Sequence, residues 1–409
     1  MKQAFFFILA LLLLSSSVFS FAQVDQSEII YRRSSLYTLM IEEPSRPYAG
    51  EIQKTFINAE IPDKFNIHLL SARKIKNGVS KSVKKREDKI YTQEDNIYRY
   101  LLKNRVAKAM VAKWFNRSPN GAFNMNLIAE RGSYNASDMD VKLAKSSKRG
   151  LALLADAGEE LIKNTFVIVN DFDYLSKEEV ANKTKAGLGL LKEIADLADV
   201  EIDTDLADET LTTFGKGYVI RTTSYLYQLD WNDSVAAVFY NDYWMDDDSS
   251  DENRKEAFDN SKIFKLKLVG WEVAWADLQS TSYTQKSEDE LIRVATIRAI
   301  DAVIAKLQKK YEIFRTKTPL YSSDPLSAKI GLKEGLEKGD KYEVLEQIMD
   351  KNGRTKYKRK GIIKVDKTHI WDNRFMAAEE PDNEQGQLEY TLFKGGKGFY
   401  KGMLIRQIN

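Results

Sequence analysis

A helical pattern of apolar residues passes directly into a continuous apolar run near the middle of the chain. Within residues 151–164 the apolar positions recur at helical spacing, at Leu151, Leu154, Ala155, Leu161 and Ile162. Residues 166–169 (FVIV) are then apolar at every position, which predicts a strand covered on both faces. Ser176 and Glu179 match a capping box at the start of a second helix. The order helix, strand, helix is typical of a layered α/β domain.

Other segments before residue 316 extend this pattern. It predicts a strand within residues 32–43, one helix over residues 92–115, a strand over 123–129 and a helix over 137–148. Residues 218–231 and 262–275 are long, β-branched and aromatic, so they predict antiparallel strands. Ser287 and Glu290 predict the cap of a helix that reaches about residue 311 and carries a broad apolar stripe.

The sequence pattern changes near Phe314, from long predicted elements to short apolar runs separated by glycine turns. This spacing predicts a small β-barrel or an open sheet. The glycine-rich segment FKGGKGFYKG matches neither phosphate-loop pattern, so we expect a β-hairpin turn there, with Gly395, Gly396, Gly398 and Gly402. The predicted fold is a mixed α/β domain over residues 23–315, with helices on a mixed sheet, followed by a small all-β domain over residues 316–409.

Residues 1–22 match the three parts of a secretory signal sequence. Lys2 supplies the positive charge, residues 4–14 form the apolar core, and Ser20 to Ala22 precede the expected cleavage site. The apolar core is shorter than the roughly 20 residues that cross a bilayer. The chain has no Cys, which excludes an acylated Cys anchor and disulfides. We therefore expect cleavage after Ala22 and a periplasmic or extracellular protein of a bacterial envelope.

The net charge of the chain is close to zero and gives little long-range attraction for a charged partner, because 62 Lys and Arg residues nearly balance 60 Asp and Glu residues. This balance argues against nucleic acid as a partner. Residues 73–89 are an exception, with eight basic residues among few apolar ones. The run is typical of a solvated loop. The alternative is a contact for an anionic envelope polymer.

Most catalytic constellations are missing from the sequence. His68 and His369 are the two histidines, and neither lies in a metal-ligand spacing such as HExxH. There is no GxSxG nucleophile elbow and no thiol. The acidic segment DDDSSDEN could hold calcium through Asp246, Asp248 and Ser250, but it lacks the glycine of an EF-hand loop, and we expect a solvated loop.

Two carboxylates at the end of the predicted central strand are a further candidate. Asp171 and Asp173 lie where α/β folds often place sites, and a glycosidase needs two carboxyl groups. Polar residues are also common where strands end. Tyr240, Tyr243 and Trp244 could stack on sugars, although large aromatic side chains more often fill a core.

Two segments resemble known protein families. The helix followed by NTFVIVNDFDYLSKEE looks like the α/β domain shared by the curli secretion channel lipoprotein and the penicillin-binding-protein activator lipoproteins. The segment KIGLKEGLEKGDKYEVLE resembles the SH3-like module of flagellar assembly protein T, whose turn positions here are Gly331, Gly335, Gly339 and Asp340. The resemblances imply an envelope assembly or scaffolding role and no catalytic residues. This chain lacks the acylated Cys of the lipoproteins.

The sequence therefore predicts an exported, non-enzymatic envelope protein that acts in assembly or as a scaffold. Expected partners are envelope proteins or a cell-wall polymer, and contact with a membrane surface and formation of a homo-oligomer stay open. We predict no catalytic, cofactor-binding or metal-binding residue. The alternative is a secreted protein that binds or hydrolyses a glycan through Asp171, Asp173 and exposed aromatic side chains. Solvent exposure of Trp244, Trp271 and Trp275 discriminates between the two hypotheses.

Overall fold

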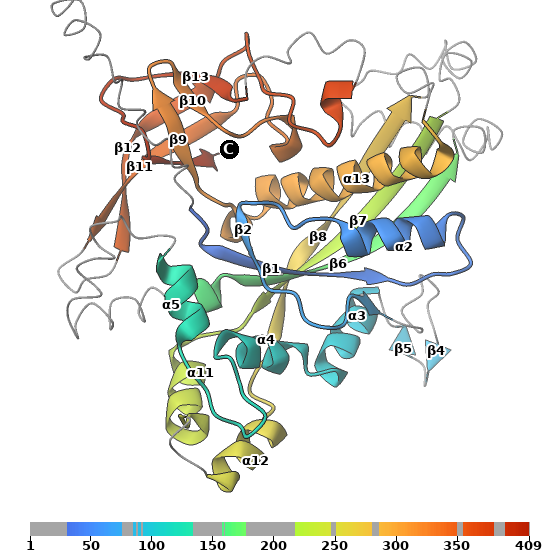
Figure 1. Ribbon diagram of the computed structural model, residues 1–409, viewed down its shortest axis with the longest axis vertical. Helices are drawn as coiled ribbons and strands as arrows, with labels where there is room; N and C mark the ends of the chain where they lie inside the picture. The colour runs from blue at the N-terminus through green and yellow to red at the C-terminus, as the bar shows by residue number, and fades with distance from the viewer. Residues whose placement is uncertain are drawn as a thin grey trace, which may run out of the picture. The chain divides into compact units, whose positions relative to one another are not determined.

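A six-stranded mixed sheet lies at the centre of the computed structural model (Figure 1). Its strands are β1 (Ser34–Ile41), β2 (Phe65–Ile67), β3 (Lys74–Ile75), β6 (Thr165–Ser176), β7 (Gly217–Leu229) and β8 (Leu266–Gln279). The order is β2-β1-β6-β7-β8, with β3 also paired to β1. β1 is parallel to β2, β3 and β6, whereas the β6–β7 and β7–β8 pairs are antiparallel. The chain has the mixed α/β class that its sequence predicts.

The structure describes residues 31–75, 85–86, 89–90, 93–133, 158, 160–176, 217–246, 251–279, 286–349, 355–379 and 389–408. The signal-like segment, the helix predicted over 137–148 and the helix predicted after Ser176 lie outside these residues. Most of the basic run over 73–89 also lies outside them, apart from β3 and the short β4–β5 ladder (Lys85–Arg86 and Lys89–Ile90). Within the described ranges, no helix has the length and apolarity to cross a membrane.

Helices cover both faces of the sheet (Figure 1). α2 (Ala49–Asn58) and α13 (Glu288–Lys310) pack on one face, and α3 (Gln93–Lys103) and α4 (Val106–Trp114) pack on the other. In β6, Phe166 and Ile168 join the core on the side of α2 and α13. Val167 and Val169 join the core on the side of α3 and α4. All four side chains are at most 1% exposed, which confirms the prediction of a strand covered on both faces.

α13 confirms the helix predicted from Ser287. The Glu290 amide donates to the Ser287 hydroxyl at 3.4 Å, and the Ser287 amide donates to the Glu290 carboxylate at 2.9 Å. This capping box satisfies two amides that the first helical turn cannot pair internally. Near the middle of the helix, the Arg298 guanidinium donates two hydrogen bonds to the Phe375 carbonyl, at 3.0 and 2.8 Å.

The segment 92–115 forms two helices instead of the one that was predicted. The chain turns between α3 and α4 at Arg105, which adopts a left-handed φ of 52°. The Arg105 amide donates to the Leu102 carbonyl, so the first helix closes there with a tighter turn. The apolar periodicity runs through this break because both helices face the same core, and periodicity alone therefore does not reveal it.

The strand predicted over residues 123–129 is also wrong. The helix α5 (Asn126–Ser133) begins inside this segment, and the Asn124 side chain accepts a hydrogen bond from the Asn126 amide at 3.1 Å. Phe123 lies among aromatic rings of α12 (Glu252–Asn260) and of the π-helix Phe239–Tyr243 that follows α11 (Asp233–Val238). Its apolar character reports this packing and not a strand.

β6 runs further than its apolar core indicates. Ser176, predicted to cap a helix, is the last residue of the strand and pairs with Tyr218 of β7. The long antiparallel partner explains the extension, because β7 offers backbone hydrogen bonds beyond the point where the apolar run ends.

The strands after α13 close into a barrel in the order β10-β13-β12-β11-β14-β9. They are β9 (Thr318–Ser323), β10 (Leu326–Ala328), β11 (Lys341–Met349), β12 (Thr355–Val365), β13 (Thr391–Gly395) and β14 (Leu404–Ile408). A separate core fills the barrel, with Leu320, Val344, Ile363, Phe393 and Ile405 among its members. Of the two arrangements that the spacing allowed, the structure has the closed barrel.

The glycine-rich segment before β14 is a crossover and not the predicted hairpin turn. β13 pairs with β12 and β10, whereas β14 pairs with β11 and β9, so two strands separate them. Gly398 and Gly402 do have positive φ values, of 89° and 90°. The glycines thus report the backbone conformation of the connection but not which strands it joins.

Glycine substitutions test how tightly the barrel closes. A Cβ at Gly331 would lie 2.0 Å from the Trp371 carbonyl oxygen, which is backbone. We expect Gly331→Ala to lower the free energy of unfolding by about 1–3 kcal/mol, measured by urea denaturation. Gly50→Ala is the matched control, because nothing lies within 4 Å of that Cβ in the first turn of α2. Equal stability of the two variants would contradict the close contact at Gly331.

Candidate functional site

His68 is a structural residue packed inside the α/β part. It is fully buried and stacks on Trp114, with ring centroids 5.0 Å apart. Nε2 lies 3.1 Å from the Met110 carbonyl and Nδ1 lies 2.9 Å from Arg131 Nη1. A neutral ring that donates from Nε2 and accepts at Nδ1 satisfies both neighbours. Burial and the nearby Arg131 charge lower the pKa of His68 to about 3. His369 lies elsewhere, beside Tyr390.

Asp171 and Asp173 lie together, but they share a cation. Arg46 Nη1 forms an ion pair with Asp171 and a second one with Asp173 at 3.3 Å. Asp171 is 3% exposed, and the same Arg46 nitrogen also donates to the Phe172 carbonyl. The pair lies just beyond the carboxyl end of β1, whose ladder with β6 ends at Met40 and Asn170. The arrangement ties the chain after β1 to β6, which is a structural role.

The aromatic residues proposed for sugar stacking are divided between core and surface. Tyr243 is buried, and Tyr240 and Trp244 contact Phe115 and Phe239 in one aromatic cluster. Trp275 is half-buried, and the Arg221 guanidinium lies 5.5 Å from its ring centroid. Trp271, on the edge strand β8, is 45% exposed. Of the three tryptophans that discriminate between the hypotheses, Trp271 is the most exposed.

The acidic segment contributes a helix cap. The Asp251 carboxylate accepts from the amides of Asn253 and Arg254 at 3.0 and 3.2 Å, at the start of α12. Asp246 is exposed, and Asp248 and Ser250 lie outside the described residues. Among the side chains that the structure describes, no three His, Asp or Glu residues converge on a metal position.

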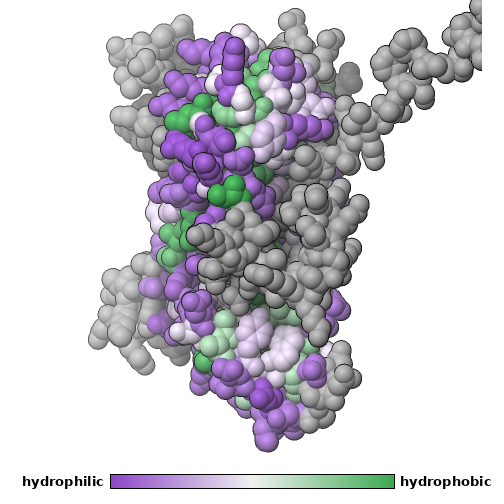
Figure 2. Space-filling model, turned by 90° about the vertical axis from the view of Figure 1, so that its left-hand side faces the viewer, coloured by the Kyte–Doolittle hydropathy of each residue, from purple (hydrophilic) through white to green (hydrophobic). Residues whose placement is uncertain are grey.

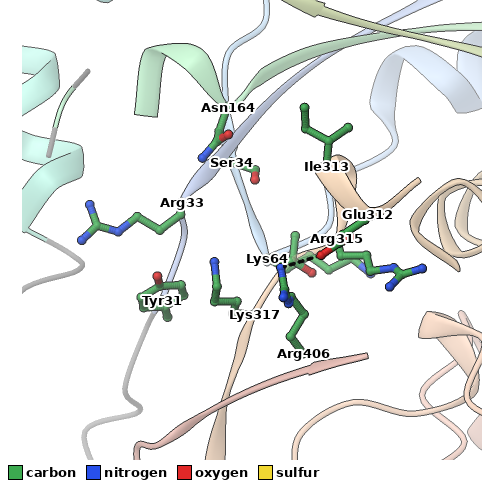
Figure 3. A pocket seen from close by; sticks show the side chains of 11 residues that line it. Tyr31, Arg33, Ser34, Lys64, Asn164, Glu312, Ile313, Arg315, Lys317 and Arg406 are labelled. Atoms are coloured by element: carbon green, nitrogen blue, oxygen red, sulfur yellow. Dashed lines mark ion pairs between the residues drawn. The ribbon is translucent and has the colours of Figure 1, made fainter. Parts of the chain in front are cut away.

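A cavity of about 480 Å³ opens at the amino ends of the parallel strands (Figure 3). Ser34 is the first residue of β1, Lys64 directly precedes β2, and Asn164 directly precedes β6. The connection from α13 to β9 and one residue of β14 complete the wall. We call this cavity the cationic pocket, and its lining residues are Tyr31, Arg33, Ser34, Lys64, Asn164, Glu312, Ile313, Arg315, Thr316, Lys317 and Arg406.

Two of the basic residues in the cationic pocket are engaged by the protein itself. Arg315 donates to the carbonyls of Gln308 and Lys309, at 3.1 and 2.7 Å, and so closes the end of α13. Arg406 forms ion pairs with Glu343 at 2.6 Å and with Glu312 at 3.3 Å, the second drawn in Figure 3.

The other three cations, Arg33, Lys64 and Lys317, form no ion pair within the part of the chain that the structure describes. Arg33 is 7% exposed, and its Nε and Nη1 have no hydrogen-bond partner among the described residues. The Lys317 ammonium lies 4.2 Å from the centroid of the Tyr357 ring. These three charges are the part of the cationic pocket that has no carboxylate in direct contact, although Glu160 acts through space on Arg33 and Lys317.

Burial is the main electrostatic influence on the two lysines of the cationic pocket. Burial lowers the pKa of Lys317. Among the neighbouring charges, Glu160 has the largest effect and acts against this change, whereas Arg406 and Arg33 lower the pKa further. Burial also lowers the pKa of Lys64, although Glu334 and Asp301 act against this change. The protonated form of each lysine is therefore less favoured in the cationic pocket than in water. An anion placed beside the ammonium group would raise its pKa again.

The chain matches no known protein-family model, and no curated protein shows a significant match to it.

Sequence reasoning missed the cationic pocket because its residues come from five separate segments. Tyr31 and Arg33 precede β1, while Lys317 directly precedes β9 and Arg406 lies on β14. Each basic residue alone resembles an ordinary surface residue. Arg33 carries one usable signal, since it directly precedes a strand that is buried along its whole length.

The pH dependence of stability tests the role assigned to His68. Its pKa falls from 6.5 to about 3 on folding, so its contribution is present above pH 6.5 and is lost as the pH falls toward 3. At pH 4.5 we expect the loss to reach about 3 kcal/mol relative to pH 7. Urea denaturation at pH 7.0, 5.5 and 4.5 measures it, and His68→Gln removes this component of the slope.

His369→Gln is the matched control and keeps the wild-type slope. An identical pH dependence in the wild type and in His68→Gln would contradict a buried, neutral His68.

Proposed function

We propose that the chain is an exported, non-enzymatic protein of a bacterial envelope that acts in assembly or as a scaffold by binding other envelope components. The observation that carries this proposal is the cationic pocket, an open cavity in which three positive charges form no ion pair among the described residues. Such a pocket is suited to holding a charged partner, and it contains no paired nucleophile and base among its lining residues. Export rests on the signal-like pattern of residues 1–22.

The fold supports the proposal in a second way. We infer that the barrel of β9 to β14 is an SH3-like module, because it is small, closed, and has the turn of Gly331 to Asp340 directly before β11. In that turn, the Asp340 carboxylate accepts from the Glu337 amide at 3.0 Å. This conformation supports the proposed resemblance to envelope assembly proteins, and so does the apolar strand β6 in the α/β part.

The surface indicates which kind of contact to expect. On the face shown in Figure 2, hydrophilic residues predominate over the described surface and hydrophobic ones lie in separate patches. A partner that binds this face would therefore meet polar and charged groups, which favour a regulated or transient contact over an obligate apolar interface.

The competing function is glycan binding or hydrolysis. The exposed Trp271 favours a sugar contact, because an exposed indole offers a stacking surface. Asp171 and Asp173 favour it less, since their shared ion pairs with Arg46 hold them in a structural arrangement.

Substitution of the two carboxylates tests these functions against each other. We expect no turnover of polysaccharide or peptide by the purified protein. We expect Asp171→Asn to lower the free energy of unfolding by about 1–3 kcal/mol, because it leaves the partly buried Arg46 with a weaker partner. Asp173→Asn is the matched control and costs less, since its side chain is 24% exposed and its contact is longer.

The assay would overturn the proposal if the wild type cleaves a glycan and folded Asp171→Asn does not. Affinity purification of the tagged protein from its native envelope, after mild crosslinking, tests the positive side. A reproducible, near-stoichiometric envelope partner is the expected result, and release as a monomer without a partner counts against it.

A further inference from the structure

We propose that the cationic pocket binds the phosphate group of a phosphate ester carried by an envelope molecule. This inference deepens the proposed binding function and rests on it. The residues that would contact the phosphate are Lys64, Lys317 and Arg406, and Arg33 would add its charge from behind the wall.

The register of the barrel brings two of these cations together. β9 and β14 are antiparallel, with Ile405 opposite Thr318 and Leu404 opposite Pro319. The same register, continued by one residue, places Lys317 opposite Arg406. Like charges directly opposite each other on neighbouring strands repel and destabilise the pair. Glu312 and Glu343 offset the charge of Arg406, but no described carboxylate forms an ion pair with Lys317. An anion between the two strands would remove the repulsion.

Arg33 strengthens the positive field without occupying the cavity. Figure 3 shows its side chain pointing away from Lys317 and Arg406. Its guanidinium lies beside the hydroxyls of Tyr31 and Tyr357, which hydrogen-bond to each other. Arginine stays protonated in proteins, and a charge that is 7% exposed is poorly screened by water. Glu160 is near enough to influence it but forms no ion pair with it. Arg33 therefore raises the affinity of the cavity for anions through space.

The number of donors favours phosphate over carboxylate. A phosphate monoester carries up to two charges and three terminal oxygens, whereas a carboxylate has one charge and two oxygens. Lys64, Lys317 and Arg406 supply several donors from three different segments, which matches the larger anion. Ser34 and Asn164 add polar side chains on the same wall.

The volume of the cavity indicates that the phosphate is part of a larger molecule. About 480 Å³ lies within the range of pockets that hold small organic ligands, about 300–1,000 Å³, and exceeds what a single phosphate fills. Tyr31 and Ile313 supply less polar surface for the rest of the ligand. A lipid headgroup and a soluble phosphorylated polyol share this chemistry, and binding experiments distinguish the two sources.

Isothermal titration calorimetry of the purified protein tests the inference, with sn-glycerol 3-phosphate and acetate at pH 7 and low ionic strength. We expect binding of the phosphate ester that weakens with added salt, and little binding of acetate. Lys317→Met and Lys64→Met should each weaken binding at least tenfold. Lys358→Met is the matched control, because Lys358 is an exposed lysine of β12 outside the cationic pocket, and it should leave binding unchanged. Lys317→Arg keeps the charge and should retain most of the affinity.

Cosedimentation with vesicles that contain phosphatidic acid, a lipid whose headgroup is a phosphate monoester, identifies the source. Sedimentation that depends on Lys317 supports a lipid headgroup, and binding of glycerol phosphate without sedimentation supports a soluble ester. The inference is overturned if glycerol phosphate does not bind, if acetate binds equally well, or if Lys358→Met weakens binding as much as Lys317→Met. Urea denaturation of each variant separates lost binding from lost folding. If Lys317→Met does not fold, the binding measured for Lys64→Met decides the test.

Failure of this inference and failure of the proposed function have different signatures. If phosphate does not bind but an envelope partner still co-purifies with Lys317→Met, the inference fails and the binding function stands. If phosphate binds but the protein has no partner and cleaves a glycan, the proposed function fails.

Discussion

Burial of β6 on both faces is the constraint on which the rest of the structure depends. Its run of four apolar side chains sends Phe166 and Ile168 to one face and Val167 and Val169 to the other, so one layer of helices cannot cover it. The strand also pairs on both edges, with β1 and β7, because its buried backbone groups need partners. The parallel pairing with β1 then sets which residues meet at the two ends of these strands. Ser34 and Asn164 lie at the amino ends, and Asp171 lies at the carboxyl end.

The polar residues inside the α/β part show what a satisfied interior looks like. His68 and Arg131 share a hydrogen bond, and Arg131 also donates to the Ile67 carbonyl at 2.6 Å and lies 4.6 Å from the Trp114 ring. Burial lowers the pKa of Arg131 to about 10, which still leaves it charged at neutral pH. A buried cation is tolerated here because carbonyl, imidazole and aromatic groups surround it. This network needs no ligand, and it explains why a fully buried histidine is not a metal site.

Sequence patterns predicted the helices and strands that are determined by residues close together in the chain. The two-sided strand, the antiparallel pair β7 and β8, the Ser287 cap and the strands of the barrel all follow from periodicity, β-propensity or capping residues. The failures have one physical cause, which is that tertiary contact overrides a local signal. Phe123 is apolar because it packs on Phe239 and not because it is in a strand, and the glycines near Gly398 fix a conformation but not which strands are joined. The cationic pocket could not be predicted at all, since it needs the chain before β9 to lie beside β14, and the pairing of these strands is set only in the closed barrel.

Two arginines at opposite ends of the parallel strands differ in their charged partners, and the comparison bears on the cationic pocket. Arg46 is partly buried and has two carboxylate partners, Asp171 and Asp173. Arg33 is more deeply buried, yet it has no ion pair among the described residues. An unpaired buried charge costs several kcal/mol, and an apolar side chain of similar size would avoid that cost. Burial disfavours the Arg33 cation, but Tyr31, Tyr357 and Glu160 act against that effect and its pKa is raised, so groups of the protein offset the cost without an ion pair. An anion in the cationic pocket would add to this offset through space, since the Arg33 side chain points away from Lys317 and Arg406.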